Sequence, residues 1–410
     1  MPNNRLIDMQ HRAFRFFQDH TNLNPGSPGY GLTADSTARP TVASIAATGF
    51  MLSSLVIGAS QGYISDDAAL LITRHTLETL FERVPHRYGF FAHYLDIERA
   101  TRHRMCEYST IDTALCLNGV ITAASYFNND VIHDLADRLF ARVEWQRLFH
   151  DMQGRKMLYM SYNPDKGGAY VTDEPGFIHQ WDMFAEQLMI YVMIGAGPYQ
   201  QDAKALYDGF TRQKGSYKDI TYLYSPGNAL FVYQFPLAWL DLADWLDADG
   251  ISWFDNARKA ILAHQALSVD LMDDYRTFSP CRFGFNASDT PRGYRVFGGL
   301  PNHHHTFETD GTVAPFSMVG ALPFLPELAL TTIEDMAGIP GLYKQYGFMD
   351  AFNFEDGHWI SNKIIAIDKG LEMLMVNAVL SKDVYRAYMA HPLIQKGMAT
   401  LGWTRTNKEE

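Results

Sequence analysis

Positively charged residues and cysteine are both scarce in this sequence. Against 46 acidic residues there are 34 lysines and arginines, which gives a formal net charge of −12. A surface of that sign disfavours nucleic acid and anionic membranes as partners, because both attract basic proteins. The cysteines Cys106, Cys116 and Cys281 form no CxxC pair and are too few for a disulfide framework. Neither a disulfide scaffold nor a cysteine-ligated zinc module is therefore expected.

A long run of strongly hydrophobic residues is also missing. The longest uncharged stretch, residues 40–65, contains Thr41, Ser44, Ser53, Ser54 and Gln61. A membrane span needs about 20 predominantly apolar residues, so this stretch is better explained by a helix buried on all sides within a large protein. The N-terminus has no apolar signal core. We therefore expect a cytoplasmic protein, or a periplasmic or secreted one if an export signal has been trimmed.

The common nucleotide, cofactor and metal motifs are absent. The sequence has no GxGxxG, P-loop or GxSxG motif. The run His303–His305 is consecutive, and the HxxxH and HExxH spacings that place two ligands on one ion do not occur. We predict no cofactor and no metal, and expect a histidine of this run, His305, to line a polar cleft instead.

Helical periodicity dominates what is present. Apolar residues recur at three- and four-residue steps, for example at Leu70, Leu77 and Phe81. Helices are predicted over residues 6–19, 42–60, 65–84, 109–126, 131–149, 182–194, 202–211, 229–246, 253–270, 326–346, 368–380 and 381–390. Strand signals are short, at residues 89–94, 156–162 and 168–172.

No linker-length segment or repeat divides the chain, so residues 1–410 are predicted to form a single domain. About a dozen helices in one domain exceed a simple bundle. We therefore predict an all-α fold, an (α/α)6 barrel or toroid with a few short strands in loops, in which uncharged inner helices are ringed by amphipathic outer ones. An irregular all-α protein is the alternative. Aromatic residues make up 13%, and together with the acids they suit either a core or a carbohydrate cleft.

Acidic residues embedded in apolar sequence are the candidate site residues, because such a carboxyl must be paired, hydrogen-bonded or functional. Asp112 follows Ser109 at capping-box spacing, so it either caps a helix or faces a cleft. Asp182 and Glu186 are four residues apart, which would place both on one face of a helix start and raise the pKa of each. They serve either as a general acid and its neighbour or as acids at the positive end of a helix.

Three further acids share this kind of setting. Asp310 precedes a glycine and is expected on a loop beside Glu308. Asp350 lies in the aromatic- and acid-rich segment YGFMDAFNFEDGHW. Asp368 follows the apolar run IIAI and opens a predicted helix, where it is either an N-cap or a cleft carboxylate.

Segments along nearly the whole chain resemble the glucoamylase-like family that includes glycoside hydrolase family 144, the bacterial endo-β-1,2-glucanases. The similar segments are GLTADST, SIAATGFMLSSLVIGASQGYIS, STIDTALCLNGVITAASYF, FAEQLMIYVMIGAGP, GFNASDTPRGY, TDGTVAPFSMVGALPFLPE, YGFMDAFN and IDKG. The resemblance implies an (α/α)6 barrel and an inverting glycoside hydrolase that acts on a β-glucan or β-glucooligosaccharide, with a β-1,2 linkage as the expected one.

The resemblance also implies roles for individual residues. Glu186 matches the family's general acid and Asp368 its general base. Asp112, Asp182, Asp310 and Asp350 are expected to bind sugar hydroxyls, and Trp181, Tyr170 and Phe283 to stack on sugar rings. The chain departs from the family pattern at Arg282–Phe283, Lys369 and Leu371, and we expect these positions to line subsites.

Two other function classes stay open. One keeps the toroid but makes the protein a lyase, isomerase or epimerase of another small substrate, suggested by Cys106 and by the tyrosine and histidine content near the expected cleft. The other is a non-catalytic glycan-binding protein. The expected partner is a carbohydrate in two of the three readings, and the sequence leaves the oligomeric state undetermined.

Overall fold

Helices contain far more residues than strands in the computed structural model, which describes residues 2–165 and 175–406. The α-helices are α1 (Pro2–His20), α2 (Ile45–Ser60), α3 (Asp66–Glu82), α4 (Thr110–Phe127), α5 (Asp130–Ala141), α6 (Leu188–Ala196), α7 (Gln200–Gly209), α8 (Phe231–Gln234), α9 (Trp253–Asp270), α10 (Pro315–Val319), α11 (Pro326–Ala337), α12 (Ala366–Leu380), α13 (Asp383–Ala390) and α14 (Pro392–Thr400). Two 3-10 helices, η1 (Trp145–Leu148) and η2 (Pro236–Ala238), join them.

The strands are short and pair as antiparallel ribbons within the described residues. They are β1 (Val42–Ser44), β2 (His86–Arg87), β3 (Phe90–Phe91), β4 (Tyr94–Asp96), β5 (Tyr108–Ser109), β6 (Phe149–Met152), β7 (Arg155–Tyr162), β8 (Phe177–Gln180), β9 (Lys214–Tyr217), β10 (Ile220–Leu223), β11 (Trp245–Leu246), β12 (Ala287–Ser288), β13 (Arg295–Val296), β14 (Tyr343–Lys344), β15 (Gly347–Phe348), β16 (Phe352–Asn353), β17 (Trp359–Ile360) and β18 (Thr404–Arg405). β7 is the longest and pairs with β5, β6 and β8. The prediction of a helix-dominated fold with few short strands is confirmed.

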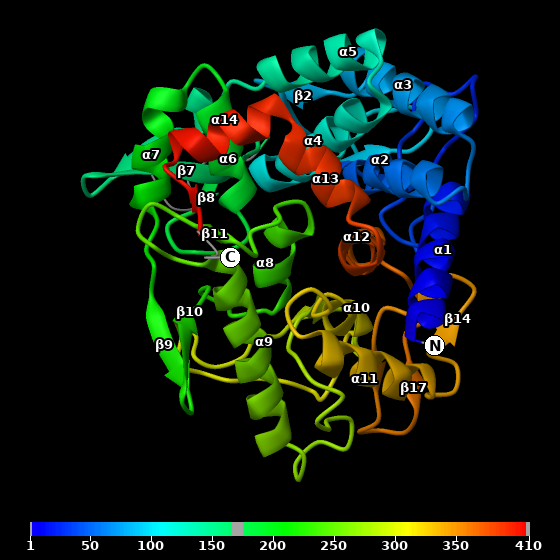
Figure 1. Ribbon diagram of the computed structural model, residues 1–410, viewed down its shortest axis with the longest axis vertical. Helices are drawn as coiled ribbons and strands as arrows, with labels where there is room; N and C mark the ends of the chain where they lie inside the picture. Colours follow the sequence, from blue (N-terminus) through cyan, green and yellow to red (C-terminus); the bar gives the residue numbers. More distant parts are fainter. Residues whose placement is uncertain (1, 166–174, 407–410) are drawn as a thin grey trace.

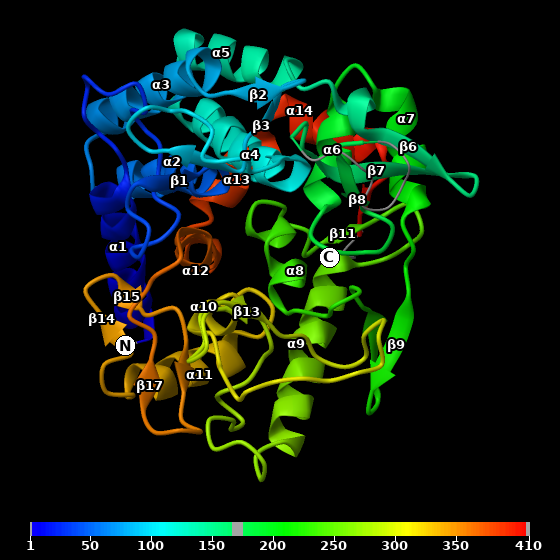
Figure 2. The same cartoon turned by 180° about the vertical axis from the view of Figure 1, so that it is seen from behind.

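Four helices form the interior. α2, α4, α6 and α12 are buried along nearly their whole length, and neighbours in the series α12, α2, α4, α6 pack against one another. α3 and α5 lie outside α2 and α4, and α1 packs along α12 and α2 (Figure 1, and from behind in Figure 2). The expectation that the uncharged stretch within residues 40–65 forms a buried helix is confirmed by α2.

Helices α2 and α4 approach so closely that their crossing excludes side chains. A Cβ atom on Gly119 would lie 2.0 Å from the carbonyl oxygen of Gly49, and one on Gly49 would lie 2.3 Å from that of Leu115. Only glycine permits backbone-to-backbone contact of this kind. The two glycines therefore set how closely α2 and α4 pack where they cross.

Several predicted helices are wrong in extent. Residues 182–187 are not helical and α6 begins at Leu188. Within the predicted helix 229–246 only α8 and η2 are helical, because Pro236 lacks the N–H that would continue α8, and residues 245–246 form β11. The predicted helix 326–346 ends at Ala337, followed by Gly338 and then Pro340. The predicted helix 131–149 ends at Ala141 and gives way to η1 and β6. The predicted strand 168–172 lies outside the described residues.

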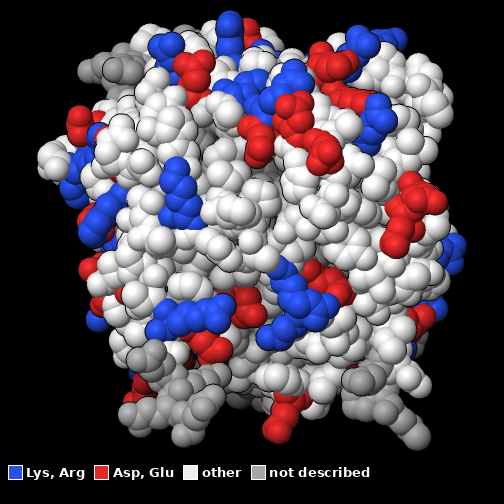
Figure 3. Space-filling view, turned by 45° about the horizontal axis from the view of Figure 1, so that its top comes forward, with Lys and Arg blue, Asp and Glu red and all other residues white. Residues whose placement is uncertain are grey.

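Charged side chains are mixed on the surface, and no described helix is long and apolar enough to span a membrane. On the face shown in Figure 3, acidic and basic side chains lie interspersed, and many sit next to a side chain of opposite sign. The net negative charge is therefore not concentrated in one field on this face.

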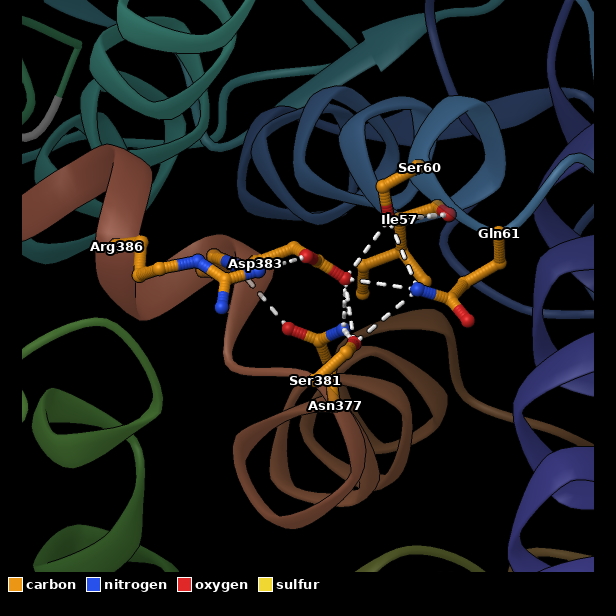
Figure 4. Close-up of polar contacts among 8 residues, drawn as sticks. Ile57, Ser60, Gln61, Asn377, Ser381, Asp383 and Arg386 are labelled. Atoms are coloured by element: carbon orange, nitrogen blue, oxygen red, sulfur yellow. Dashed lines mark hydrogen bonds and ion pairs between the residues drawn. The ribbon is translucent and has the colours of Figure 1, made fainter.

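A carboxylate ties the ends of three helices together. Asp383, in the first turn of α13, is 7% exposed, and its Oδ2 accepts hydrogen bonds from the ends of α2 and α12 (Figure 4). The donors are Ser60 Oγ (2.7 Å), Gln61 Nε2 (3.1 Å), Asn377 Nδ2 (3.0 Å) and Ser381 Oγ (2.5 Å). Its Oδ1 pairs with Arg386 at 2.6 Å. These bonds favour the ionised carboxylate, and although burial alone would raise the pKa of Asp383, they hold it below its usual value.

Replacing Asp383 with alanine should lower the free energy of unfolding by about 3 kcal/mol, because buried donors on α2 and α12 lose their acceptor. Chemical denaturation of the purified protein measures this. The control is Asp134→Ala, which removes an exposed i,i+4 ion pair with Arg138 and should change stability by no more than about 0.5 kcal/mol. Equal losses for both variants would contradict the structural role of the Asp383 cluster.

Candidate active site

Three acids predicted from sequence lie at the starts of buried helices. Asp112 is in the first turn of α4, Asp368 is in the first turn of α12, and Glu186 stands two residues before α6. The partial positive charge at a helix N-terminus favours carboxylates there. Each of these acids therefore stands at the N-terminal end of a buried helix.

Asp350 and Asp368 form a carboxyl pair. Asp350 lies between β15 and β16, and the two side chains are within hydrogen-bonding reach of each other. Both residues are buried, at 5% and 6% exposure. Burial and then the charge and hydrogen bond of Asp350 raise the pKa of Asp368 well above its usual value. Burial likewise raises the pKa of Asp350 to about 6. Asp368 is no N-cap, since that position belongs to Ile365.

Further hydrogen bonds and charged groups surround this carboxyl pair. Asp350 Oδ2 accepts the backbone N–H of Asp289 at 2.7 Å. The carboxylate of Asp289 in turn accepts Ser361 Oγ and Lys363 Nζ, each at 2.8 Å. The next residue on α12, Lys369, is 1% exposed, and its Nζ donates to the carbonyl oxygen of Phe348 at 2.9 Å.

Glu372 is the other partner of Lys369. The two residues form an ion pair that is buried on both sides. Burial raises the pKa of Glu372 to about 7 even with this ammonium beside it. The positive charge of Lys369 also acts on Asp350 and Asp368, so it offsets part of the cost of burying them.

Glu186 has the protonation behaviour of a general acid. Burial raises its pKa to about 8, and the negative charge of Asp112 adds to the rise. At neutral pH its carboxyl therefore holds a proton. The chain that follows Glu186 is apolar, since Leu188, Met189 and Ile190 are fully buried.

His93 faces Asp112 from the other side. Its Nε2 lies 3.4 Å from Asp112 Oδ1, and its Nδ1 lies 2.7 Å from Glu107 Oε1. The ring stacks on Tyr94 with centroids 3.8 Å apart. Burial alone would lower the pKa of His93, but Asp112, Glu107 and Asp35 raise it to about 9. An imidazolium is therefore present beside Asp112 at neutral pH.

Tyr294 joins the two groups of acids. It stands on the turn between β12 and β13, and its side chain is 57% exposed. Desolvation by the surrounding protein raises the pKa of the Tyr294 hydroxyl. The negative charges of Asp368, Asp350 and Glu186 raise it further. The charges of Asp368 on α12 and of Glu186 before α6 thus both act on the Tyr294 hydroxyl.

An open pocket lies beside Tyr294. It has a volume of about 420 Å³ and is lined by Asp35, Arg39, Tyr94, Asp289, Tyr294 and Lys363, among others. A solvent-reached concave site with convergent acids and two tyrosines can bind a polyhydroxylated ligand and transfer protons to it. This arrangement defines the candidate active site.

The chain can now be compared with known proteins. A family model described as "putative glucoamylase" matches residues 178–392, which is just over half of the chain. The chain belongs to this putative glucoamylase family. The crystal structure of a family protein from Bacteroides caccae superposes with a TM-score of 0.85 at 20% identity, covering 99% of this chain and all of that one.

Two relatives have named activities. An endo-β-1,2-glucanase from Chitinophaga pinensis superposes with a TM-score of 0.84 at 19% identity, covering 98% of this chain and 99% of that one. An exo β-1,2-glucooligosaccharide sophorohydrolase from Parabacteroides distasonis is 22% identical over 97% of this chain. The chain spans 58% of the length of that relative.

In this family member the pairing of Asp182 with Glu186 is wrong. The segment between them is bent rather than helical, so the four-residue spacing does not place them on one helix face. The charge that acts on Glu186 is that of Asp112 instead. The capping-box interpretation of Asp112 holds only in part: Ser109 Oγ accepts the N–H of Asp112, while the carboxylate of Asp112 turns to His93.

The stacking roles of two aromatic residues are also wrong. Trp181 is 3% exposed and Phe283 is 1% exposed, both within the core, so neither can present a ring face to a sugar. The indole N–H of Trp181 donates to Thr110 Oγ1 at 3.0 Å, which satisfies it internally. The predicted subsite positions Lys369 and Leu371 are buried as well, at 1% and 0%. Tyr170 lies outside the described residues.

The remaining predicted binding residues lie elsewhere. Arg282 pairs with Asp335 of α11 through two hydrogen bonds, at 2.6 and 3.1 Å, which occupies its guanidinium. His305 is exposed on a loop. Asp310 Oδ1 accepts the N–H of Thr312, and Asp310 lines a second pocket of about 400 Å³ with Arg292 and Arg295. Among the described residues, no group of three or more His, Cys, Asp or Glu side chains is placed to hold a metal ion.

Several site residues were missed from sequence. Four of them, Glu107, Tyr294, Asp289 and Lys363, stand on turns, loops or strand ends, outside any apolar run. Asp289 and Tyr294 do fall within the family-like segment GFNASDTPRGY, so that resemblance could have drawn attention to them. His93 lies within the apolar segment GFFAHYL, and a titratable residue in apolar sequence is a signal that could have found it.

Replacing His93 with glutamine should cost stability in a pH-dependent way. The folded state raises the pKa of His93 from 6.5 to about 9, so its contribution is fully present below about pH 6.5 and is lost as pH rises through 9. The difference in free energy of unfolding between wild type and variant should fall by up to about 3 kcal/mol across that window. Denaturant titrations at several pH values measure it.

His391 supplies a control of opposite sign. It is 8% exposed, and burial lowers its pKa. The stability of wild type relative to His391→Gln should therefore rise, not fall, between pH 5 and 7. A His93→Gln difference that stays constant from pH 6 to 10 would contradict an imidazolium at this site.

Proposed function

We propose that this protein is an inverting glycoside hydrolase that cleaves β-1,2-linked glucan or glucooligosaccharides, with Glu186 as general acid and Asp368 as general base. The observation that carries the proposal is the raised pKa of Glu186, about 8, together with the action of its charge on Tyr294, which lines a solvent-reached pocket. Hydrolysis of a glycoside needs a carboxyl that is still protonated at neutral pH to protonate the leaving oxygen.

The second carboxyl completes the chemistry. In an inverting hydrolase, a carboxylate removes a proton from water as the water oxygen attacks the anomeric carbon from the opposite side. Asp368 comes from a different helix start, and its charge reaches the same tyrosine, Tyr294, as that of Glu186. Tyr94, Tyr294 and the charged groups of Asp35, Arg39 and Lys363 would then bind sugar rings and hydroxyls in the pocket.

The linkage is supported by the relatives. Both the Chitinophaga endo-glucanase and the Parabacteroides sophorohydrolase act on β-1,2-linked glucose according to their names. The proposal covers polymer and oligosaccharide alike, because one relative is an endo- and the other an exo-enzyme. We also propose that residues 1–410 form one domain, an (α/α)6 toroid, supported by the packing of α12, α2, α4 and α6 in series.

Cys106 gives no support to a lyase or isomerase. Its Sγ lies 3.4 Å from the backbone nitrogen and 3.3 Å from the carbonyl oxygen of Tyr94. Burial raises the pKa of its thiol, whereas a nucleophilic cysteine needs a lowered one.

Incubation with linkage-defined glucans tests the proposal. Wild type should release sophorose-series products from β-1,2-glucan, with the new reducing end in the α configuration when read immediately by NMR. Glu186→Gln and Asp368→Asn should each lower kcat by at least about a thousandfold, since each removes one proton-transfer group, while circular dichroism stays native. Near-wild-type turnover in either variant would overturn that residue's role, and substrate binding without product would favour a glycan-binding protein.

The pH dependence tests the acid separately. Because Glu186 must keep its proton, kcat/KM should fall as pH rises through about 8. Asp112→Asn removes a charge that raises this pKa, so the basic limb of the profile should move to lower pH. An unshifted limb in Asp112→Asn would show that the limb belongs to another group.

A further inference from the structure

The carboxyl pair has an unusual defect in its hydrogen bonding. Asp350 Oδ1 and Asp368 Oδ2 are both fully buried oxygens for which no donor is present among the described residues. Buried carboxylate oxygens without donors are strongly disfavoured. The two side chains nevertheless approach within hydrogen-bonding reach of each other.

From this geometry we infer that Asp350 and Asp368 share a single proton between Asp350 Oδ1 and Asp368 Oδ2, and that Asp350 is the positioning residue that sets the pH at which Asp368 can accept a proton. One proton in this place supplies both oxygens with a hydrogen bond. Two carboxyls in close contact cannot both ionise readily, so one proton per pair is the expected state over a wide pH range.

The surroundings fix which oxygens are left to share it. Asp350 Oδ2 is already occupied by the N–H of Asp289. The carboxylate of Asp289 is held away from the pair by Ser361 and Lys363. Each neighbour of Asp350 is thus committed elsewhere, and Oδ1 is left for Asp368.

The charged groups around the pair come from four segments. Lys369 and Glu372 lie on α12 itself, Lys363 and Asp289 lie on the preceding loop and at the end of β12, and Tyr294 is on the turn that follows β12. The Lys369 ammonium lowers the cost of one negative charge on the pair, while Asp289 and Glu372 raise it. Because these charges act in opposite directions, they favour a pair that holds one proton and one negative charge over a pair with two protons or two negative charges.

The inference rests on the proposed function and balances its proton transfers. Before reaction the pair holds one proton and one negative charge. As the water oxygen bonds to the anomeric carbon, its proton passes to Asp368 and the pair becomes neutral, while Glu186 gives its proton to the leaving oxygen. The pair then releases one proton to solvent and Glu186 takes one up, which restores the starting state.

The matched experiment compares Asp350→Asn with Asp356→Asn. The amide in Asp350→Asn still accepts from Asp289 N but donates its own N–H to Asp368, so Asp368 no longer shares a proton. The acid limb of kcat/KM should move at least one pH unit lower, and the basic limb should stay in place. Asp356 is exposed six residues further along, so the same chemical change there should leave both limbs and kcat unaltered.

A readout without turnover separates this inference from the proposed function. In isotope-edited infrared spectra of the protein labelled at aspartate, the carbonyl stretch of a protonated carboxyl should be present in wild type and Asp356→Asn at pH 7. It should be lost in Asp350→Asn and in Asp368→Asn, either of which suffices if the other fails to fold. An unmoved acid limb, or a band that persists in these variants, would overturn proton sharing. Full activity of Asp368→Asn would instead overturn its role as base and leave the infrared test standing.

Discussion

The site depends on one constraint, the burial of carboxyl groups at the starts of helices that have no polar face. Helices α4, α6 and α12 are enclosed by protein along nearly their whole length. The polar groups they offer solvent are therefore concentrated at their ends. Asp112, Glu186 and Asp368 stand there, and the low polarity behind them raises the pKa values of Glu186 and Asp368. The close crossing of α2 and α4 at Gly49 and Gly119 belongs to the same packing.

Burial raises the pKa values of Glu186, Asp350 and Asp368, and the two halves of the site differ in how charge is balanced. Around Asp112 a cation, the imidazolium of His93, lies between Asp112 and Glu107. Around Asp368 the nearest cation is Lys369, which is itself engaged by Glu372. One acid thus faces a dedicated positive charge and the other faces a second carboxyl.

The sequence could predict a site residue where its signal is local, and it could not where the residue's contacts come from distant segments. Asp112, Glu186, Asp350 and Asp368 were found because an acid within apolar sequence signals burial, and burial is a local property of the chain. The prediction that Asp182 and Glu186 share a helix face was wrong, because it assumed a helix from their spacing, whereas the backbone bends before α6. The sugar-stacking roles of Trp181 and Phe283 were mispredicted, because an aromatic side chain next to an acid can point either into the core or into a cleft. The charged partners of His93 are Glu107, just before β5, and Asp112 in α4, which only the tertiary structure brings next to it.

The departures from the family pattern have a physical explanation that the sequence alone did not offer. Lys369, Leu371 and Phe283 were expected to line subsites, but all three are buried, so none of them selects among sugar linkages by contact. Lys369 instead forms a buried ion pair with Glu372, three residues along the same helix face. A lysine at this position needs such an acid, because an unpaired buried ammonium would be costly. The lysine at this position therefore acts through the electrostatic setting of Asp350 and Asp368, because its positive charge lowers the pKa of both carboxyls.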